Sequence, residues 1–338
     1  MTDRPVRLLD LGEVSPLRSQ AIYHGLGESM DDASPDTIVL CRPAAPYFCV
    51  GYHQSPAEEL DLDWCREAGY PVLQRRIGGG TVFLDSSQLF YQCIFHRRRA
   101  PLMVDAIYRR FLMPVVEALR ALGLAATLEG VNEIEVEGRR IAGTGGGQIG
   151  EAVVVVGNVL LDFPEALMAR AWRVPSPAFR RLAREGLRRY LTTLGRELRG
   201  RRATPAALAD RIAGAYADRL GEALVAGALT PREGEAVRAA EEQLGTGRFT
   251  RGGGAAPYRG LKIARGVYVF EGRAAGAAVR VSLRLRHGLV DGLAVRGADS
   301  RRARALVGRP SATLAPAAGA GNPADALGEL LASGVPAA

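Results

Sequence analysis

Residues 74–85 read QRRIGGGTVFLD, so that two arginines and three consecutive glycines precede a short apolar run. Glycine has no Cβ, and the backbone N–H groups of such a turn can therefore approach a bound anion closely. The arginines can donate charge-assisted hydrogen bonds to the same anion. The alternation of apolar and polar residues after the glycines predicts two short strands joined by a turn. On this stretch alone, a plain β-hairpin is the simpler interpretation.

Residues 129–150, EGVNEIEVEGRRIAGTGGGQIG, repeat this chemistry. A strand, a tight Glu–Gly turn, an arginine pair and a glycine-rich loop follow one another, and a second strand comes after them. Two glycine-rich, arginine-flanked hairpins in one sheet could face each other across a ligand that carries a phosphate. The chain has no GxxxxGK[ST] motif, and no GxGxxG opens a helix after a strand, so the pattern indicates neither a P-loop nor a dinucleotide fingerprint.

The size and composition of the chain are those of a globular protein. It has 338 residues, of which 47% are hydrophobic and 24% charged, and this length predicts two domains. No apolar run approaches the roughly 20 residues of a membrane span. The N-terminus has no signal-like apolar core, so we expect a cytoplasmic protein with no membrane partner.

The net charge is +8, and nearly all of the basic residues are arginine. They are scattered among acidic residues on predicted helices, without aromatic residues between them, which favours solvated helix faces over a nucleic-acid surface. An acidic partner protein would be favoured by such a field. The cysteines form no CxxC pair and have no neighbouring histidine, so we interpret them as reduced, mostly buried thiols and expect no metal site in the protein itself; they are Cys41, Cys49, Cys65 and Cys93.

The order of the predicted elements favours an α+β fold with a mixed sheet. Helices are expected over residues 17–30, 60–68 and 103–124, with a kink or restart at Pro114 in the last of these, and short strands are expected between them and up to residue 163. Residues 177–245 are mostly helical in their pattern. The stretch RFTRGGGAAPYRG then predicts a domain boundary. We therefore expect a catalytic domain over 1–245 and a small α+β accessory domain over 246–338, which ends in a helical segment.

Five short motifs follow one another in the chain: GYHQ at 51–54, the arginine–glycine turn with its aspartate at 75–85, NEI at 132–134, RRIAG at 139–143 and GNVLLD at 157–162. With these motifs the chain resembles the lipoate–protein ligases and the octanoyl and lipoyl transferases, which are relatives of the biotin–protein ligases. The resemblance covers nearly the whole chain, including the family's small accessory domain. It implies the biotin/lipoate ligase-like fold, with a largely antiparallel sheet flanked by helices.

The family's ligases join the carboxylate of lipoate to ATP and pass the acyl group of lipoyl-AMP to a lysine of a lipoyl domain. The resemblance therefore implies an enzyme that uses lipoate or octanoate, ATP and Mg²⁺, with a lipoyl-domain acceptor protein as partner. Carboxylate activation brings two anions together, which requires fixed positive charge and backbone donors. The resemblance assigns catalysis to Arg140, and binding of substrate and ATP to Arg75, Arg76, Gly78, Gly79, Gly80, Thr81, Val82, Phe83, Asp85, Asn132, Glu133, Gly143, Thr144 and Gly145.

The sequence also departs from the family's pattern. The family has a lysine where this chain has Arg140, and a guanidinium is a broad planar fork rather than a compact ammonium. Three explanations remain open: a divergent ligase, a transferase that uses a pre-made acyl-adenylate, and a non-catalytic protein that binds the acyl ligand or its adenylate. Four further family positions differ, with Gln74 for an arginine, Leu84 and Val156 for histidines, and Gln88 for an asparagine.

A cysteine-dependent octanoyltransferase is the nearest alternative enzyme. Those relatives use a thiolate nucleophile placed just before the strand that resembles residues 132–138, or well after it. No cysteine of this chain follows Cys93, which itself lies in a predicted strand. We therefore interpret Cys93 as a structural thiol and disfavour this class.

Overall fold

The computed structural model describes residues 5–201, 203–221, 224–247, 260–273, 280–296 and 306–311. By its contacts the chain divides into two compact units, the first made of Met1–Phe163 and Thr192–Gly253, the second of Pro164–Leu191 and Gly254–Ala338. Pro164–Leu191 therefore groups with the C-terminal part of the chain although it precedes residue 245. The expected limits of the two domains stay a prediction.

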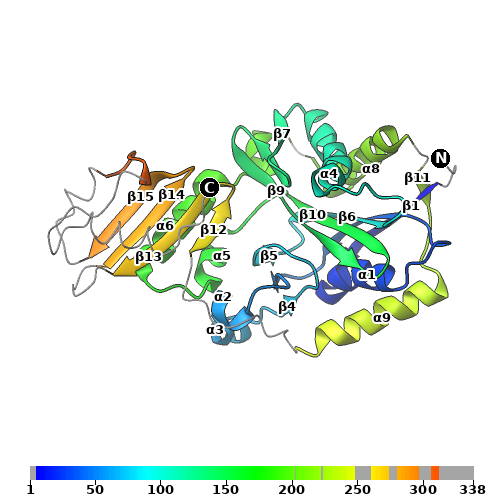
Figure 1. The fold of residues 1–338 in the computed structure, drawn as a ribbon, viewed down its shortest axis with the longest axis horizontal. Coiled ribbons are helices and arrows are strands. Elements are labelled where there is room, and N and C mark those ends of the chain that lie inside the picture. The colour runs from blue at the N-terminus through cyan, green and yellow to red at the C-terminus, as the bar shows by residue number, and fades with distance from the viewer. Residues whose placement is uncertain are drawn as a thin grey trace. The chain divides into compact units, whose positions relative to one another are not determined.

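An eight-stranded sheet forms the centre of the first unit, in the order β11-β1-β2-β6-β10-β9-β8-β7 (Figure 1). Only β1 makes parallel pairs, with β2 and β11, and every other neighbouring pair is antiparallel. The predicted mixed, largely antiparallel sheet is thereby confirmed. Its strands are β1 (Val6–Val14), β2 (Thr37–Pro43), β6 (Gln88–His96), β7 (Ala126–Glu129), β8 (Glu133–Val136), β9 (Arg139–Ile149), β10 (Ala152–Leu160) and β11 (Leu224–Ala226).

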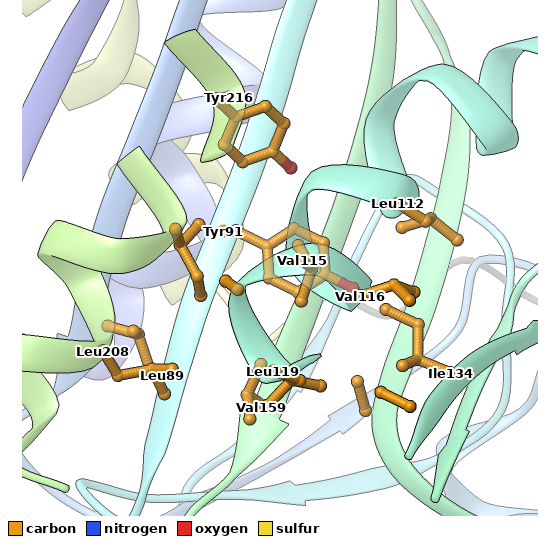
Figure 2. Packing of buried hydrophobic residues seen from close by; sticks show 14 of the residues in the cluster. Leu89, Tyr91, Leu112, Val115, Val116, Leu119, Ile134, Val159, Leu208 and Tyr216 are labelled. Carbon is orange, nitrogen blue, oxygen red and sulfur yellow. The ribbon is translucent and has the colours of Figure 1, made fainter. Parts of the chain in front are cut away.

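Helices cover both faces of this sheet, as an α+β fold requires. On one face, α4 (Val104–Arg120) and α8 (Pro205–Leu220) bury a cluster around Tyr91, Ile134 and Val159 (Figure 2). On the other face, α1 (Pro16–Glu28) and α9 (Pro231–Gly245) pack against each other and bury a second cluster. Helix α4 is a single helix that contains Pro114, without the restart that the sequence allowed.

A separate three-stranded sheet carries the arginine–glycine turn. It has the order β4-β3-β5, with β3 at Tyr47–Val50, β4 at Val72–Gln74 and β5 at Val82–Leu84. The short helices α2 (Pro56–Glu59) and α3 (Leu62–Glu67) connect β3 to β4. Strand β5 pairs with β3, whereas β6 pairs with β2 and β10. The two strands after the glycines thus lie in different sheets, and the hairpin interpretation of residues 74–85 is wrong.

The second unit combines two helices with a four-stranded antiparallel sheet. The helices are α5 (Glu165–Ala171) and α6 (Pro177–Tyr190), and the strands are β12 (Leu261–Ala264), β13 (Val267–Arg273), β14 (Arg280–Arg286) and β15 (Leu289–Arg296). Helix α6 packs on the sheet, where Arg284 donates to the carbonyl of Leu182 at 3.0 Å. The expected C-terminal sheet domain is confirmed. The final helical segment of the prediction lies outside the described residues.

One short helix completes the description of the first unit: α7 (Leu194–Glu197) follows Thr192, and a loop separates it from α8. Among the helices given above, none combines the length and the apolar character that crossing a membrane requires.

Candidate active site

Arg75 lies beneath the glycine turn and holds its backbone. Its side chain is buried, and Nε and Nη2 donate to the carbonyl of Gly78 at 3.2 and 3.1 Å. Nη2 also donates to the carbonyl of Gly80 at 2.8 Å, and Nη1 to that of Cys49 at 3.3 Å. Within the described residues, no carboxylate forms an ion pair with Arg75. The hydrogen bonds of the guanidinium therefore go to backbone carbonyls and hold the turn in its shape.

This arrangement fixes the direction of the turn's amides. In a planar trans peptide the N–H points opposite to the C=O, and the chain has no cis peptide bond among its described residues. The carbonyls of Gly78 and Gly80 point toward Arg75, so the N–H groups of Gly79 and Thr81 point away from it. Two outward amides in one turn, with an arginine behind them, can form an anion-binding concavity. The turn can hold a phosphate in this way.

Gly79 and Gly80 differ in how much room the turn leaves for a side chain. Gly79 has φ +107°, and a Cβ there would lie 2.6 Å from Nη2 of Arg75. Its carbonyl also passes so close to Gly51 that a Cβ on Gly51 would lie 1.9 Å from it. A Cβ on Gly80 would meet nothing within 4 Å. Gly79 is therefore required by the turn itself, whereas the side of Gly80 is open.

The glycine-rich part of β9 comes up against this turn. A Cβ on Gly145 would lie 2.9 Å from the carbonyl of Gly78, and one on Gly147 would lie 3.4 Å from Ile77. The two glycine segments therefore lie next to each other, but they belong to different sheets rather than to the one sheet that the sequence suggested. Side chains alternate along a strand, so Gly143 lies on the same face of β9 as Gly145. Gly143 itself faces Asn158 of β10, whose Oδ1 would be 3.0 Å from its Cβ.

Arg140 lies at the start of β9 on this face. In the backbone pairing of β9 with β8, Arg140 lies opposite Glu135, and Ile141 is the extra residue of a β-bulge. Nη1 of Arg140 lies 3.9 Å from Oε1 of Glu133, a loose ion pair in which the arginine side chain remains 24% exposed. Its carbonyl accepts from the N–H of Thr192 at 2.9 Å, which anchors the backbone. The guanidinium thus keeps donors available for a ligand.

The neighbouring arginines are used differently. Arg139 forms an ion pair with Glu197 at 2.8 Å. Arg76 is exposed and pairs with Glu28. The N–H of Arg76 donates to Nε2 of His24 at 3.3 Å. Burial, and then the nearby charge of Arg76, lowers the pKa of His24 from 6.5 to about 3, so this imidazole is neutral.

Asn132 and Thr144 meet at the edge of the sheet. The hydroxyl of Thr144 donates to the carbonyl of Asn132. The side chain of Asn132 forms a hydrogen bond with the hydroxyl of Tyr108 on α4, and that hydroxyl would lie 2.9 Å from a Cβ on Gly146. Tyr108 is absent from the predicted set, because its only sequence signal is its place in the helical pattern of α4.

The turn that contains Asp85 connects β5 to β6. Asp85 accepts from the N–H of Ser87 at 2.9 Å, and burial raises the pKa of its carboxyl. Gln88 is buried, donates to the carbonyl of Phe83 at 3.0 Å and accepts from Nδ2 of Asn158 at 2.5 Å. The amide pair formed by Gln88 and Asn158 also escaped the sequence reasoning, since nothing in the pattern shows that β6 and β10 are neighbours here.

The remaining predicted residues of the turn have structural contacts. The hydroxyl of Thr81 donates to Oε1 of Gln54 at 3.0 Å, which links the turn to the end of β3. Val82 is half-buried in β5. Phe83 is buried, with its ring edge-on to Phe48 at a centroid distance of 5.3 Å. These side-chain contacts hold the turn in place.

Comparison with known proteins decides the family. Residues 15–217 match the family model of the lipoyl protein ligase A/B catalytic domain. The chain belongs to this family. One relative is the octanoyltransferase LipM of Symbiobacterium thermophilum, 30% identical over 257 residues that make up 67% of this chain and 90% of the relative. Another is the lipoate-protein ligase LplJ of Bacillus subtilis, 33% identical over 29% of each chain.

Solved structures share the family's fold. A bi-partite lipoate protein ligase from Thermoplasma acidophilum, described together with its E2 lipoyl domain, superposes with a TM-score of 0.67 at 19% identity, over 75% of this chain and 98% of that one. A lipoate-protein ligase A bound with ATP gives a TM-score of 0.60 at 20% identity, over 71% and 95%. At these identities the likeness concerns the fold alone.

The family contains ligases and transferases, so the cysteines matter. All four are free and buried. Burial raises the pKa of Cys41 and of Cys93 to about 12, and it also raises the pKa of Cys49. Since the thiolate is the nucleophile, none of these three side chains is suited to carry an acyl group at neutral pH.

The described residues contain no group of three or more His, Cys, Asp or Glu side chains that could hold a metal ion. A Mg²⁺ ion keeps several waters and binds through one or two carboxylates together with substrate phosphates. The donor set fits only this mode, in which a nucleotide brings most of the oxygen ligands, and Asp85 is the carboxylate nearest to the glycine turn in sequence.

Proposed function

We propose that this lipoyl protein ligase A/B family member activates the carboxylate of lipoate or octanoate with ATP and transfers the acyl group from the acyl-adenylate to a lysine of a lipoyl domain. The observation that carries the proposal is the glycine turn, with two N–H groups directed away from the buried guanidinium of Arg75. Such donors stabilise the phosphate charge of an adenylate without reorganising during the reaction.

The second half-reaction needs no protein nucleophile. The amine of the acceptor lysine, having lost its proton, attacks the acyl carbonyl, an amide C–N bond forms, and the C–O bond to the phosphate breaks with AMP as leaving group. Charge develops on the carbonyl oxygen in this step, and Arg140 stabilises it together with the phosphate. The buried thiols support direct transfer, because a thioester route would need a thiolate.

The bound groups occupy the glycine face of β9 in this proposal. Phosphate lies at the amides of Gly79 and Thr81, and the acyl carbonyl lies near Gly143 and Arg140. Arg75 is a positioning residue rather than a ligand. The remaining predicted binding residues keep their proposed roles in the surrounding wall, namely Arg76, Gly78, Gly80, Val82, Phe83, Asp85, Asn132, Glu133, Thr144 and Gly145. Because the reaction consumes ATP, we propose the cytoplasm as its location.

A second candidate is transfer without activation, from an acyl-adenylate made elsewhere. Two observations favour it: an octanoyltransferase relative matches this chain over 90% of its own length, and Arg140 stands where the family's ligases carry lysine. A guanidinium holds phosphate well but is a different shape from an ammonium at the reacting oxygen.

The test is release of pyrophosphate from ATP in the presence of lipoate or octanoate, run beside transfer from synthetic lipoyl-AMP to a lipoyl domain followed by mass. We expect both reactions. Transfer without pyrophosphate release would establish the second candidate. Binding of lipoyl-AMP without either reaction would leave a non-catalytic ligand-binding protein and overturn the proposal.

A further inference from the structure

Three consecutive apolar residues stand out into solvent where α4 begins. Leu102 is 94% exposed, Met103 68% and Val104 62%. Val131, in the turn between β7 and β8, is 47% exposed. Single exposed apolar residues are ordinary, but a cluster of them marks an interaction surface. We call Leu102, Met103, Val104 and Val131 the α4 patch.

The α4 patch borders the candidate site. Val104 lies one turn before Tyr108, so both side chains lie on the same side of the helix. Tyr108 forms the hydrogen bond with Asn132 and approaches Gly146, while Val131 directly precedes Asn132. Both parts of the patch therefore adjoin the sheet edge at Asn132, on the face of β9 to which Gly146 belongs, whereas the turn of Arg75 meets the opposite face at Gly145.

The charge around the patch is positive. The N-cap residue of α4, Met103, makes no side-chain hydrogen bond to the first turn, which leaves the positive end of the helix without an anionic cap. Arg109 is exposed, and no described carboxylate pairs with it. Arg110 lies over the rings of Phe95 and Phe111 and donates to a backbone carbonyl. One carboxylate, Asp105, lies in the first turn.

We propose that the α4 patch is the docking surface for the acceptor, an acidic lipoyl domain whose apolar side chains cover Leu102 and Met103. The proposal rests on the proposed function, which requires a protein to bring its lysine to the site. Apolar contacts at the centre with charges around them are the usual anatomy of a protein interface. A protein domain fits better than a lipid surface, because the nearby Arg97 and Arg98 are already paired with Glu151 and Asp32.

The test compares the double variant Leu102→Ser/Met103→Ser with the wild type. Transfer from synthetic lipoyl-AMP to a lipoyl domain is measured over a range of domain concentrations, and binding of lipoyl-AMP is measured without the domain. We expect kcat/KM for the domain to fall at least tenfold, mainly through KM, with unchanged affinity for lipoyl-AMP. Val225→Ser is the control, since Val225 is 49% exposed on β11, at the opposite edge of the same sheet.

The outcomes separate the two proposals. A wild type that binds lipoyl-AMP but transfers to no lipoyl domain overturns the proposed acceptor and the docking surface with it. Transfer by the wild type with an unchanged KM in the double variant overturns the docking surface alone. Cosedimentation with phosphatidylglycerol vesicles that the double variant loses, with KM for the domain unchanged, would assign the patch to a membrane surface instead.

Discussion

Nη2 of Arg75 lies 2.8 Å from the carbonyl oxygen of Gly80, five residues further along the chain. This contact and the two to Gly78 mean that Arg75 shapes the turn and does not itself contact the ligand. A positive charge is thereby placed behind the outward amides without occupying the space in front of them. The two neighbouring arginines therefore have different roles: Arg75 holds the turn, whereas Arg76 is exposed and forms an ion pair with Glu28.

Arg75→Lys should damage both the turn and the ligand site. A lysine ammonium cannot reach the carbonyls of Cys49, Gly78 and Gly80 in one geometry, so buried acceptors lose their donors at a cost of about 1–3 kcal/mol each. We expect a lower Tm and at least tenfold weaker binding of lipoyl-AMP by calorimetry. Arg76→Lys is the matched control for stability, and its free energy of unfolding should stay within about 0.5 kcal/mol of wild type. Equal effects of the two variants would contradict the assignment of Arg75 as the positioning residue.

Gly80→Ala should separate folding from binding. Its methyl group would meet nothing within 4 Å, so the variant should unfold at the wild-type temperature, yet the methyl group would stand on the open side of the turn and weaken lipoyl-AMP binding. Gly79→Ala should instead lower the stability, since φ is +107° and the Cβ would lie 2.6 Å from Nη2 of Arg75. If Gly80→Ala bound lipoyl-AMP with unchanged affinity, the adenylate would not lie on this side of the turn.

Arg140→Ala should nearly abolish acyl transfer. Loss of one donor to a developing oxyanion typically costs about 3–4 kcal/mol in the transition state, or on the order of a hundred- to thousand-fold in rate. Single-turnover transfer from synthetic lipoyl-AMP is the measurement. Arg140→Lys should not raise the rate, because the site with Glu133 at 3.9 Å is arranged around a guanidinium. Equal rates in wild type and both variants would place Arg140 outside the reaction.

Much of this architecture could be predicted from the sequence because its signals are local. The glycine runs, the Asx turn at Asp85 and the alternation in β8 to β10 act within a few residues, and so the strands were found in their places. The role of Arg75 could not be read in this way. Whether a guanidinium faces carbonyls or solvent is decided by the position of β3, which comes from a segment more than twenty residues earlier.

Long-range packing also explains why the hairpin interpretation was wrong and why the sequence does not show where α6 packs. The polar turn 85–88 favours a hairpin locally. In the structure, however, β5 pairs with β3 in the three-stranded sheet, and β6 pairs with β2 and β10 in the eight-stranded sheet. In the same way, the amphipathic pattern of α6 shows that one face is buried, without showing which sheet buries it. Tyr108 and Asn158 were missed for this reason, since their partners are far away in sequence.

Stability should fall in mild acid through His24. Its folded pKa of about 3 lies below the unfolded value of 6.5, so the unfolded state binds the proton first, and stability that is complete above pH 6.5 is lost as the pH falls toward 3. By linkage the loss is about 2 kcal/mol at pH 5. Chemical denaturation of His24→Gln should show a shallower decline between pH 7 and 5. Parallel declines in the two proteins would show that His24 is not the titrating group.

Tyr108→Phe should act on catalysis without unfolding the chain. The ring stays in place, while Asn132 loses the hydroxyl that orients its amide. We expect a loss of roughly tenfold in kcat, with Tm within a few degrees of wild type. Tyr52→Phe, at an exposed tyrosine, is the control. A Tyr108→Phe variant with wild-type kcat and KM would mean that Asn132 does not need this partner.

The position of α6 in the chain bears on how the protein is made. The helix leaves the ribosome about 70 residues before the strands that cover its apolar face, and at about 5–20 residues per second this face waits for several seconds. Phe179, Leu182 and Leu187 are buried in the finished chain but have no sheet to pack on during that interval. A nascent chain that stops near residue 245 therefore exposes the apolar face of α6, and we expect chaperones to bind this intermediate.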